Sequence, residues 1–254
     1  MPELPEAEYM VGRLEEYGAG AEIVRSPLGR HTLGRIRRYH RRAKNVLIEL
    51  ETGWTLRVQL GMTGHVYWIP DAKRKPRFTR AAFELKQGGA LVFEDARRFG
   101  NVSAVRTAKL PEVLNGYGPE PLDRSFRWQQ LKAAGARLAQ PVKAFLLDQR
   151  RIGGLGNIWA AESLFGARIH PARPARTLSD EEWRALHTSI RRTLRRAIAN
   201  TFKVTARPEE FPETDLQWLA VYGRASEPCR RCRHLVEKSI LAGRATYFCR
   251  HCQH

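Results

Sequence analysis

The first 228 residues of this chain contain no cysteine, which excludes a disulfide framework for most of its 254 residues. No segment approaches the roughly 18 uninterrupted apolar residues of a membrane span. The opening residues MPELPEAE carry acids where a signal peptide has a basic region. Internal repeats and low-complexity tracts are also missing. We therefore expect a soluble, cytoplasmic, globular protein with no membrane partner.

Acidic residues are scarce relative to basic ones. The chain has 26 Asp and Glu against 44 Lys and Arg, and its formal net charge is +18. This balance indicates a polyanionic partner. Because the planar guanidinium of arginine binds phosphates and guanine edges through two hydrogen bonds, nucleic acid is favoured over an anionic membrane surface. The alternative is a protein from a generally arginine-rich proteome.

Two domains fit a chain of 254 residues better than one large core. Residues 5–17 have helical spacing of apolar side chains, with Pro5 in the first turn and Gly18 after the last. Short runs with strand character follow at 21–26, 33–40, 45–50, 54–60, 64–69, 81–86, 90–94 and 101–106. Their regular spacing predicts an antiparallel sandwich or barrel in residues 1–115.

A Gly- and Pro-rich passage at 115–121 ends this first domain, and we place a linker over 116–130. The pattern then becomes helical, which predicts a helical domain over 131–220. Residues 221–254 differ again in composition and are assigned to a separate zinc finger. The sequence thus predicts three folded parts and one linker.

The clearest helix of the second domain is expected at 179–199. Ser179 and Glu182 stand in capping-box spacing, and Trp183 begins an apolar face that predicts core contacts. The opposite face carries arginines at 191, 192, 195 and 196. We interpret these arginines as a solvated face rather than as a direct contact with nucleic acid.

All cysteines lie at the end of the chain. Sixteen residues separate the pair Cys229 and Cys232 from the pair Cys249 and Cys252, the spacing of two metal knuckles on a short β-hairpin. Four thiolates in a tetrahedron predict one structural zinc ion, with no open position for chemistry. Between the knuckles, Arg244 stands at a Gly-Arg hairpin tip, where it is either a phosphate contact or a solvated surface residue.

Pro2 becomes the first residue if Met1 is removed, as is usual before proline. An α-amino group has a pKa near ~8, so roughly a tenth to a third of it is unprotonated at neutral pH, far more than of an ordinary lysine. A secondary amine that attacks C1′ of a deoxyribose gives a cationic iminium, which acidifies the 2′ hydrogens and favours β-elimination of the 3′ phosphate. The same residue also fits a merely rigid, acidic N-terminus.

Several separated segments together suggest a family. They are MPELPEAE, RRAKNVLIEL (41–50), QLGMTGH (59–65), EDARRFG (94–100), GPEPL (118–122), GGLGNIWAAESLFGARIHP (153–171) and the pattern VYGR-x4-C-x2-C-x16-C-x2-C. In this order they resemble the formamidopyrimidine-DNA glycosylase and endonuclease VIII family, and the opening is closest to its formamidopyrimidine branch. The resemblance implies an α+β multidomain fold: an N-terminal antiparallel β-sandwich with flanking helices, a helical domain with a helix-two-turns-helix motif, and a β-hairpin zinc finger.

The resemblance also implies catalytic roles. Pro2 would be the Schiff-base nucleophile, Glu3 would protonate the opening sugar, and Lys44 would be a general acid. Arg244 and Asn157 would clamp phosphates beside the lesion, and Arg244 thereby belongs to the catalytic set. Other interpretations stay open: Glu3 as a first-turn acid stabilised by a helix dipole, Lys44 as a simple phosphate contact, and Asn157 as a plain N-cap.

An enzyme that acts on a base in a duplex has to flip it out and fill the hole. The resemblance assigns this filling to Met62, Arg97 and Phe99, where Phe99 wedges the stack and Arg97 bonds the widowed base. Core packing is the alternative for Met62 and Phe99. Arg77 and Arg150 are further candidate DNA contacts.

This chain departs from the pattern of the family at two positions in the predicted first domain. Phe78 stands where relatives carry a phosphate-contacting histidine, so that contact is either lost or taken over by Arg77 or Arg80. Asp95 is followed by Ala96 rather than by the usual proline, which loosens the turn but removes no reacting group.

A third departure concerns the substrate. The segment 201–215 is shorter than the Gly- and Thr-rich segment that folds over flipped 8-oxoguanine in relatives. A shortened segment over the flipped base, here called the lid, favours formamidopyrimidines, hydantoins or oxidised pyrimidines as substrates over 8-oxoguanine.

These observations together predict a monomeric, bifunctional DNA glycosylase and abasic-site lyase of base excision repair. It would excise oxidised purines through a Pro2 iminium, cleave the strand by β- or δ-elimination, and act on double-stranded DNA in a bacterial cytoplasm, at the nucleoid. The alternatives are a non-catalytic, zinc-containing protein that binds damaged DNA, a glycosylase that prefers oxidised pyrimidines or hydantoins, and an RNA-binding zinc-ribbon protein. The joint presence of Pro2, Glu3 and Lys44 favours the enzyme.

Overall fold

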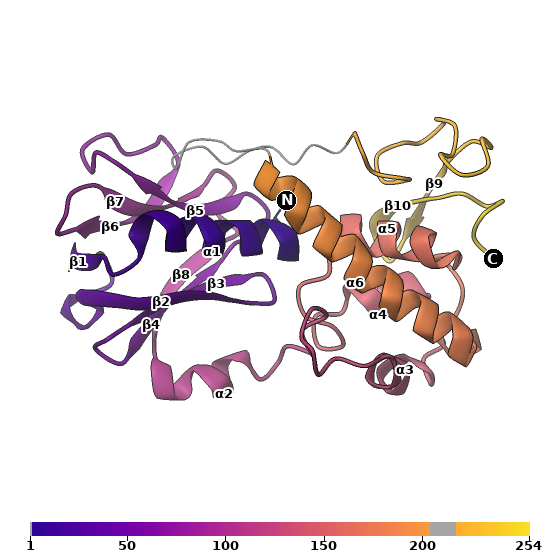
Figure 1. Ribbon diagram of the computed structural model, residues 1–254, viewed down its shortest axis with the longest axis horizontal. Coiled ribbons are helices and arrows are strands. Elements are labelled where there is room, and N and C mark those ends of the chain that lie inside the picture. Colours follow the sequence, from indigo (N-terminus) through magenta and orange to yellow (C-terminus); the bar gives the residue numbers. More distant parts are fainter. Residues whose placement is uncertain (1, 204–216) are drawn as a thin grey trace. The chain divides into compact units, whose positions relative to one another are not determined.

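The computed structural model describes residues 2–203 and 217–254 (Figure 1). The chain divides into two compact units. The first unit comprises Met1–Asn115 and Asn200–Thr214, and the second comprises Gly116–Ala199 and Asp215–His254. The finer division expected from the sequence, with a linker over 116–130 and a zinc finger from residue 221, stays a prediction.

The first unit contains the predicted helix and the predicted strands. They are α1 (Leu4–Gly18), β1 (Glu22–Arg25), β2 (Gly34–Arg42), β3 (Asn45–Leu50), β4 (Trp54–Gln59), β5 (Gly64–Ile69), β6 (Thr79–Leu85), β7 (Ala90–Asp95) and β8 (Asn101–Arg106). All strand pairs are antiparallel, in the order β5-β7-β6-β1-β2-β3-β4-β8. The short elements η1 (Arg30–Thr32), η2 (Thr107–Lys109) and α2 (Leu110–Leu114) complete the unit.

One apolar core holds this sheet together. Ile48 of β3 and Leu56 of β4 share a buried cluster with Phe83 of β6 and Phe93 of β7. Since these strands come from opposite halves of the strand order, the sheet folds over onto itself as a sandwich. In the described part of the chain the terminal strands β5 and β8 do not pair, so the sheet is not a closed barrel. Helix α1 packs on strands of both halves, β2 and β5 (Figure 1).

Helix α1 begins near its predicted start because its first turn is capped. Glu3 is the N-cap residue, and its backbone N–H donates to Oε2 of Glu6 at 2.8 Å in a capping box. Pro5 suits the first turn, where an amide hydrogen would have no helical partner. The capped turn fixes where the N-terminal residues enter the fold.

The second unit is mainly helical. Its elements are α3 (Trp128–Gly135), α4 (Val142–Leu147), α5 (Asn157–Ala167), η3 (Ala175–Thr177), α6 (Asp180–Lys203) up to residue 199, β9 (Glu237–Leu241) and β10 (Arg244–Phe248). Helices α4 and α5, joined by turns over 148–156, form the expected helix-two-turns-helix arrangement. Strands β9 and β10 form the expected hairpin. No helix in the described ranges is long and apolar enough to cross a membrane.

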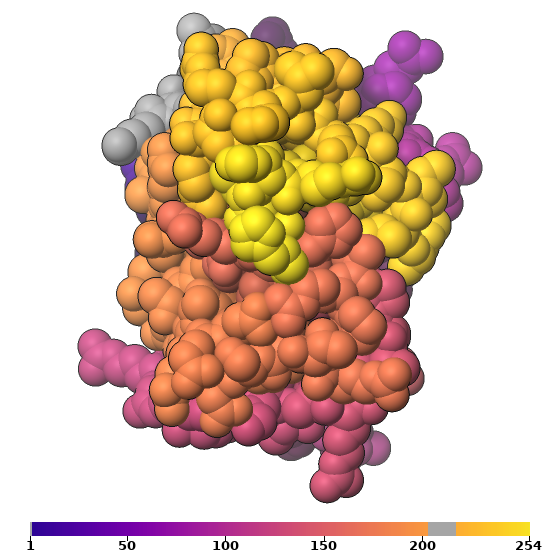
Figure 2. All heavy atoms as spheres, turned by 90° about the vertical axis from the view of Figure 1, so that its right-hand side faces the viewer, coloured from indigo at the N-terminus to yellow at the C-terminus, as the bar shows by residue number. Residues whose placement is uncertain are grey.

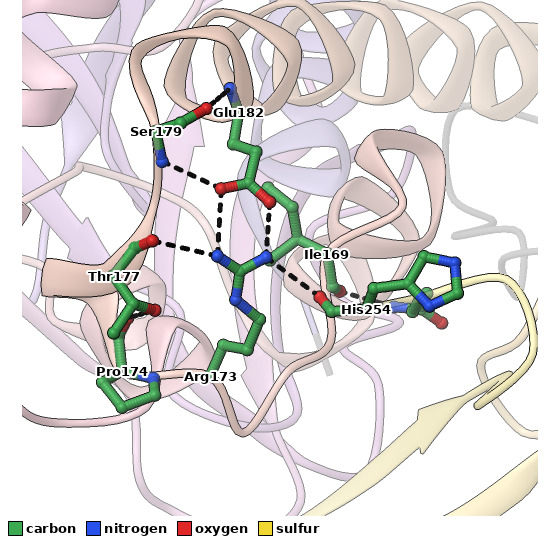
Figure 3. Close-up of polar contacts among 8 residues, drawn as sticks. Ile169, Arg173, Pro174, Thr177, Ser179, Glu182 and His254 are labelled. Carbon is green, nitrogen blue, oxygen red and sulfur yellow. Dashed lines mark hydrogen bonds and ion pairs between the residues drawn. The ribbon is translucent and has the colours of Figure 1, made fainter.

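A polar network fixes the start of α6 (Figure 3). Ser179 and Glu182 form the predicted capping box, with the Glu182 N–H donating to Ser179 Oγ at 3.3 Å and the Ser179 N–H to Glu182 Oε2 at 2.8 Å. Both terminal nitrogens of Arg173 also pair with the Glu182 carboxylate. Arg173 in turn donates to the carbonyl oxygen of His254 at 3.2 Å, so a single carboxylate links α6 to the C-terminal residue.

The arginine face of α6 is not uniformly solvated, which corrects the interpretation from sequence. Arg191 donates to the carbonyl oxygens of Pro121 and Asp123 at 2.8 and 2.6 Å. Arg196 lies over the ring of Trp218, with 4.8 Å from its guanidinium carbon to the ring centroid. Segments distant in sequence supply these partners, and helical periodicity alone carries no information about them.

A buried carboxylate joins α5 to the segment before the zinc finger. Glu162 is 7% exposed, and its two oxygens accept N–H groups of three consecutive residues, Ala220, Val221 and Tyr222, at 2.8 to 2.9 Å. Apolar residues of α5 also share a buried cluster with the cysteines. In Figure 2 the C-terminal residues (yellow) lie directly against the helical part of this unit (salmon).

Replacing Glu162 with Ala should lower the free energy of unfolding by about 2–5 kcal/mol, because three buried N–H groups lose their acceptor. Urea denaturation at pH 7 measures this change. Glu181→Ala removes an exposed acid in the first turn of α6 and should change the free energy by no more than about 1 kcal/mol. Equal losses in the two variants would contradict the role given to Glu162.

Candidate functional site

Pro2 and Glu3 are both buried at the start of α1, and Glu3 is fully inaccessible. Glu3 is the N-cap of the helix, so its carboxyl group has a structural role. This role is close to the alternative interpretation of Glu3 as a first-turn acid stabilised by the helix dipole. This role also holds the carboxyl group next to the residue that would supply the nucleophilic amine. The cap therefore orients Pro2 and Glu3 together.

Lys44 lies half-buried in the two-residue turn between β2 and β3. Arg41 reaches across this turn: its Nε donates to Glu8 of α1 at 2.7 Å, and its Nη1 donates to the carbonyl oxygen of Ala43 at 2.9 Å. The turn that carries Lys44 is thereby held against α1, the helix that begins beside Pro2. The Glu8 carboxylate thereby neutralises the charge of Arg41 beside this turn.

The turn that carries Met62 packs directly against the loop that carries Phe99. Gly61 has φ +60°, and a Cβ there would lie 2.6 Å from the carbonyl carbon of Phe99, so only glycine permits this approach. On the other side of Met62, the Thr63 hydroxyl oxygen accepts the N–H of Arg97 at 3.1 Å. The three residues predicted to fill the hole left by a flipped base are therefore neighbours.

Phe99 and Arg97 are exposed on this loop, and Phe99 has 59% of its surface accessible. The Arg97 guanidinium lies over the Phe99 ring at 4.9 Å from the centroid. Core packing, the alternative interpretation for Phe99, is wrong. Met62 is half-buried, so it is less accessible than Arg97 and Phe99.

Asp95 organises the loop from beneath. Its buried carboxylate accepts the Thr63 hydroxyl and the N–H groups of Arg97 and Gly100, the latter two at 3.2 and 2.7 Å. Burial raises the pKa of Asp95, but these hydrogen bonds outweigh burial and hold the pKa below its ordinary value. The same bonds offset the loosening expected from Ala96.

The position of the missing histidine is occupied by Phe78, which is 37% exposed. Arg77 lies over its ring at 5.3 Å from the centroid and is itself exposed. Arg80, the other expected substitute, donates through Nε to the carbonyl oxygen of Asp95 at 2.8 Å. The two arginines thus differ: Arg80 supports the loop, whereas Arg77 presents its charge to solvent.

Asn157 is the first residue of α5, and the N-cap is Gly156. The N-cap interpretation of Asn157 is therefore wrong. Its Nδ2 donates instead to the carbonyl oxygen of Ala245 on β10 at 3.0 Å, and only 6% of the residue is exposed. The glycine before it adopts an extended conformation, which starts the helix one residue earlier than a capping asparagine would.

Arg244, the residue before Ala245, begins β10 after the turn residues Ala242 and Gly243, which have φ of 49° and 69°. It is exposed. Beneath it, the fully buried ammonium of Lys143 donates to the Ala245 carbonyl at 2.9 Å and to Thr246 Oγ1 at 2.7 Å. Two buried donors therefore fix the backbone next to Arg244.

Arg150 is exposed and forms a bidentate pair with Asp148, with both N–O distances at 3.0 Å. A phosphate would have to compete with this carboxylate. Gln149 stays in the turn, where it accepts the N–H of Gly154 at 2.9 Å and donates to the Leu155 carbonyl at 2.7 Å. The loop before α5 is thus held by its own polar residues.

The four cysteines lie together, with their sulfurs within 4.8 Å of one another. The distances are 4.0 Å between the sulfurs of Cys229 and Cys252 and 3.4 Å between those of Cys232 and Cys249. A tetrahedral zinc ion with Zn–S bonds of about 2.3 Å holds its sulfurs about 3.8 Å apart. The donor set therefore fits one structural zinc ion.

The electrostatics of the knuckles agree with this fit. Burial raises the pKa of Cys229, but N–H groups of Arg231 and Cys232 donate to its sulfur and lower the pKa to about 7. Burial and the neighbouring thiols raise the pKa of Cys252 to about 12. Because the Cys252 thiol holds its proton at neutral pH, a cation that binds all four sulfurs has to displace protons from the cluster.

Sequence reasoning did not identify the residues that support these sites. Lys143 stands alone among apolar residues in the helix VKAFLL, which is a signal of a buried charge with a specific partner. The sequence singles out Asp95 only through Ala96, the residue that follows it, and does not indicate the hydrogen bonds of its carboxylate. The expected lid, 201–215, lies outside the described residues from position 204 onward.

Three protein families match successive parts of the chain. They are the formamidopyrimidine-DNA glycosylase N-terminal domain over residues 1–102, the formamidopyrimidine-DNA glycosylase H2TH domain over 117–207, and the zinc finger found in FPG and IleRS over 226–254. Together they account for most of the sequence in the order expected from its motifs.

Individual relatives are similar over their whole length. The formamidopyrimidine-DNA glycosylase of Thermus thermophilus is 39% identical over an alignment that covers 100% of this chain and 98% of that protein. The enzyme of the same name from Enterobacter sp. strain 638 is 36% identical, with 100% of both chains covered. The structure of Lactococcus lactis Fpg with abasic-site DNA has a TM-score of 0.88 and 29% identity, and covers 99% of both chains.

Asp95→Asn should destabilise the first unit in a pH-dependent way. The folded-state pKa of Asp95 lies below the unfolded value of about 3.9, so its stabilisation is present above that pH and is lost as the pH falls through the folded pKa. The difference in unfolding free energy between wild type and variant should therefore be full at pH 7 and smaller at pH 3. Urea denaturation at both pH values measures it.

The matched control is Asp71→Asn, which changes an exposed aspartate of the same unit. This variant should show little difference from wild type at either pH. An Asp95→Asn difference that is the same at pH 7 and pH 3 would show that the charge of the carboxylate does not stabilise the loop.

Proposed function

Because the chain belongs to the formamidopyrimidine-DNA glycosylase family, we propose that it is a DNA glycosylase and abasic-site lyase of base excision repair that removes oxidised purines. One observation carries the proposal for this chain. Pro2 and Glu3 lie buried at the start of α1, and the Arg41–Glu8 pair holds the Lys44 turn against the same helix. The three residues with proposed chemistry thus belong to one packed assembly.

In the first step the lone pair of the Pro2 nitrogen attacks C1′ of the damaged nucleotide. The glycosidic bond breaks, and its electron pair leaves with the base. The Pro2 nitrogen passes its own N–H proton to the departing base. Glu3 then delivers a proton to O4′ as the C1′–O4′ bond opens, and the nitrogen lone pair forms a cationic iminium with C1′. Because Pro2 is a secondary amine, the iminium cannot lose its charge by shedding a nitrogen proton.

The iminium charge drives strand cleavage. A proton leaves C2′, the C3′–O bond breaks, and the 3′ phosphate departs with its electron pair in a β-elimination. A second elimination on the 5′ side gives the δ-product. Lys44 serves as the general acid for a leaving oxygen or base, and its half-buried position at a tight turn limits the freedom of its ammonium group.

Each unit contributes DNA contacts in this proposal. In the first, Met62, Arg97 and Phe99 fill the space left by the flipped base, and Arg77 contacts a phosphate. In the second, Arg244 and Asn157 bind phosphates, with Asn157 using the N–H left over from its bond to Ala245. Arg150 also binds a phosphate once that phosphate displaces the carboxylate of Asp148.

The four cysteines hold a zinc ion that supplies structure and no chemical step. Its proposed role is to hold the hairpin whose tip carries Arg244. We also propose that the protein is a monomer. Its proposed location is a bacterial cytoplasm, at the nucleoid, and the DNA substrate and the bacterial relatives support this location. Preference among oxidised bases is tested by single-lesion duplexes that carry a formamidopyrimidine, 8-oxoguanine, a hydantoin or an oxidised pyrimidine.

Borohydride trapping tests the central claim. Protein with a verified Pro2 N-terminus, incubated with an abasic-site duplex and borohydride, should form a covalent protein–DNA complex on a denaturing gel, because reduction of the iminium fixes the C1′–N bond. A chain that retains Met1 should form much less, since its Pro2 nitrogen is an amide and only the primary amine of Met1 remains at that end. Absence of a complex with the verified N-terminus would overturn the lyase and favour the non-catalytic DNA-binding protein.

Glu3→Gln separates the chemistry of Glu3 from its structural role. Glutamine keeps an oxygen that accepts the helix N–H, so α1 should stay capped. Excision of a damaged base should fall by about 100-fold or more, the usual contribution of general acid catalysis. Unchanged excision by a folded Glu3→Gln protein would restrict Glu3 to the capping role.

Arg244→Ala should weaken DNA binding to a similar extent for all sequences and reduce the slope of log affinity against log salt by about 0.9, the value for one phosphate. Fluorescence anisotropy over a salt series measures both. Arg137→Ala removes the same charge from an exposed position in the same unit and serves as the control. Equal effects of the two variants would indicate a general charge effect and no specific contact.

A further inference from the structure

Two histidines stand beside the zinc knuckles in an arrangement that packing does not require. His234 follows Cys232 by two positions, and His251 lies between Cys249 and Cys252. Their rings are stacked, with centroids 4.2 Å apart and an angle of 10° between the planes. Both side chains are exposed, so the stack buries little apolar surface.

The ring nitrogens and the Cys232 sulfur are positioned as a set of metal ligands. One nitrogen of each ring and the sulfur all lie within 4.8 Å of one another. Bonds of about 2.0–2.1 Å to nitrogen and about 2.3 Å to sulfur bring tetrahedral ligand atoms to about 3.5 Å from each other. The two exposed rings have to turn out of their stack for one nitrogen of each to point at the same ion.

Cys232 is the cysteine that can take part, because it alone of the four is not fully buried. A thiolate bound to one zinc ion keeps further lone pairs, so it is able to bridge to a second ion. In the described part of the chain, neither His234 nor His251 has a hydrogen bond or ion pair that would occupy its ring nitrogens. Both imidazoles are therefore available as ligands.

The space next to the pair admits an ion and its remaining ligands. A hollow of about 540 Å³ is lined by His234, Leu235, Glu237, Arg250, His251 and His254. The positive charge of Arg250 is offset by Glu237, whose carboxylate lies 3.1 Å away. A third imidazole, that of His254, lines the same hollow, and water completes the coordination.

We propose that His234, His251 and the bridging thiolate of Cys232 form a second metal site, for a divalent transition metal ion of the zinc, cobalt, nickel or copper class. These ions favour imidazole and thiolate ligands over oxygen. The site lies beside the four-cysteine zinc and leaves that set complete. It is independent of the glycosylase reaction, so the failure of one proposal leaves the other standing.

Cobalt(II) added to full-length protein that holds one zinc ion per chain tests the proposal. After dialysis, metal analysis should find one zinc and one cobalt per chain, and a thiolate-to-cobalt charge-transfer band should appear in the near-ultraviolet. His234→Ala or His251→Ala should weaken cobalt binding by at least about tenfold, the lower limit seen when groups that support metal ligands are removed. Retention of zinc by the variants shows that the finger is folded.

His31→Ala is the matched control, because it removes an exposed histidine of the other unit, and its cobalt binding should equal that of wild type. Three results would overturn the site: no retained cobalt, cobalt that replaces zinc one for one, or binding that the double variant His234→Ala/His251→Ala leaves unchanged. Histidine-dependent binding without the charge-transfer band would remove Cys232 from the ligand set and overturn the bridged site.

Discussion

The helical unit depends on a buried positive charge and on the carbonyl oxygen that accepts a hydrogen bond from it. Lys143 is fully buried and donates to Ala245 and Thr246, and Asn157 donates to the same Ala245 oxygen. A buried ammonium without partners costs several kcal/mol, so the arrangement that keeps these contacts is strongly favoured. They therefore fix α4, α5 and the hairpin in one arrangement, and Arg244 takes its position from the hairpin.

In the first unit a buried negative charge has the corresponding role. The buried carboxylate of Asp95 gathers the N–H groups of a loop whose outer residues, Arg97 and Phe99, are exposed. Side chains that are exposed for contact with a ligand are not held in place by packing. A buried, charged group beneath each loop supplies that order, and the strength of charge-assisted hydrogen bonds explains why a charge is used.

Much of this protein follows from local pattern. The eight strands, α1, the Ser179–Glu182 cap of α6 and the cysteine hairpin were all predictable, because each depends on residues close together in sequence. The family motifs added the expected roles of Pro2, Glu3 and Lys44. Strand spacing alone left sandwich and barrel open, since it is the same in both. The family motifs implied the sandwich, and the shared core of the two half-sheets confirms it.

The sequence by itself determined the elements, the order of the motifs and the metal-binding cysteines, because these depend on periodicity and spacing. The tertiary structure alone decided which charges have partners. Arg41 is neutralised by Glu8, Arg191 binds backbone carbonyls of a distant segment, and Asn157 bonds to Ala245, 88 residues away. The physical reason is that a buried polar group is satisfied by whichever donor or acceptor the fold brings to it, and spacing along the chain does not encode that partner.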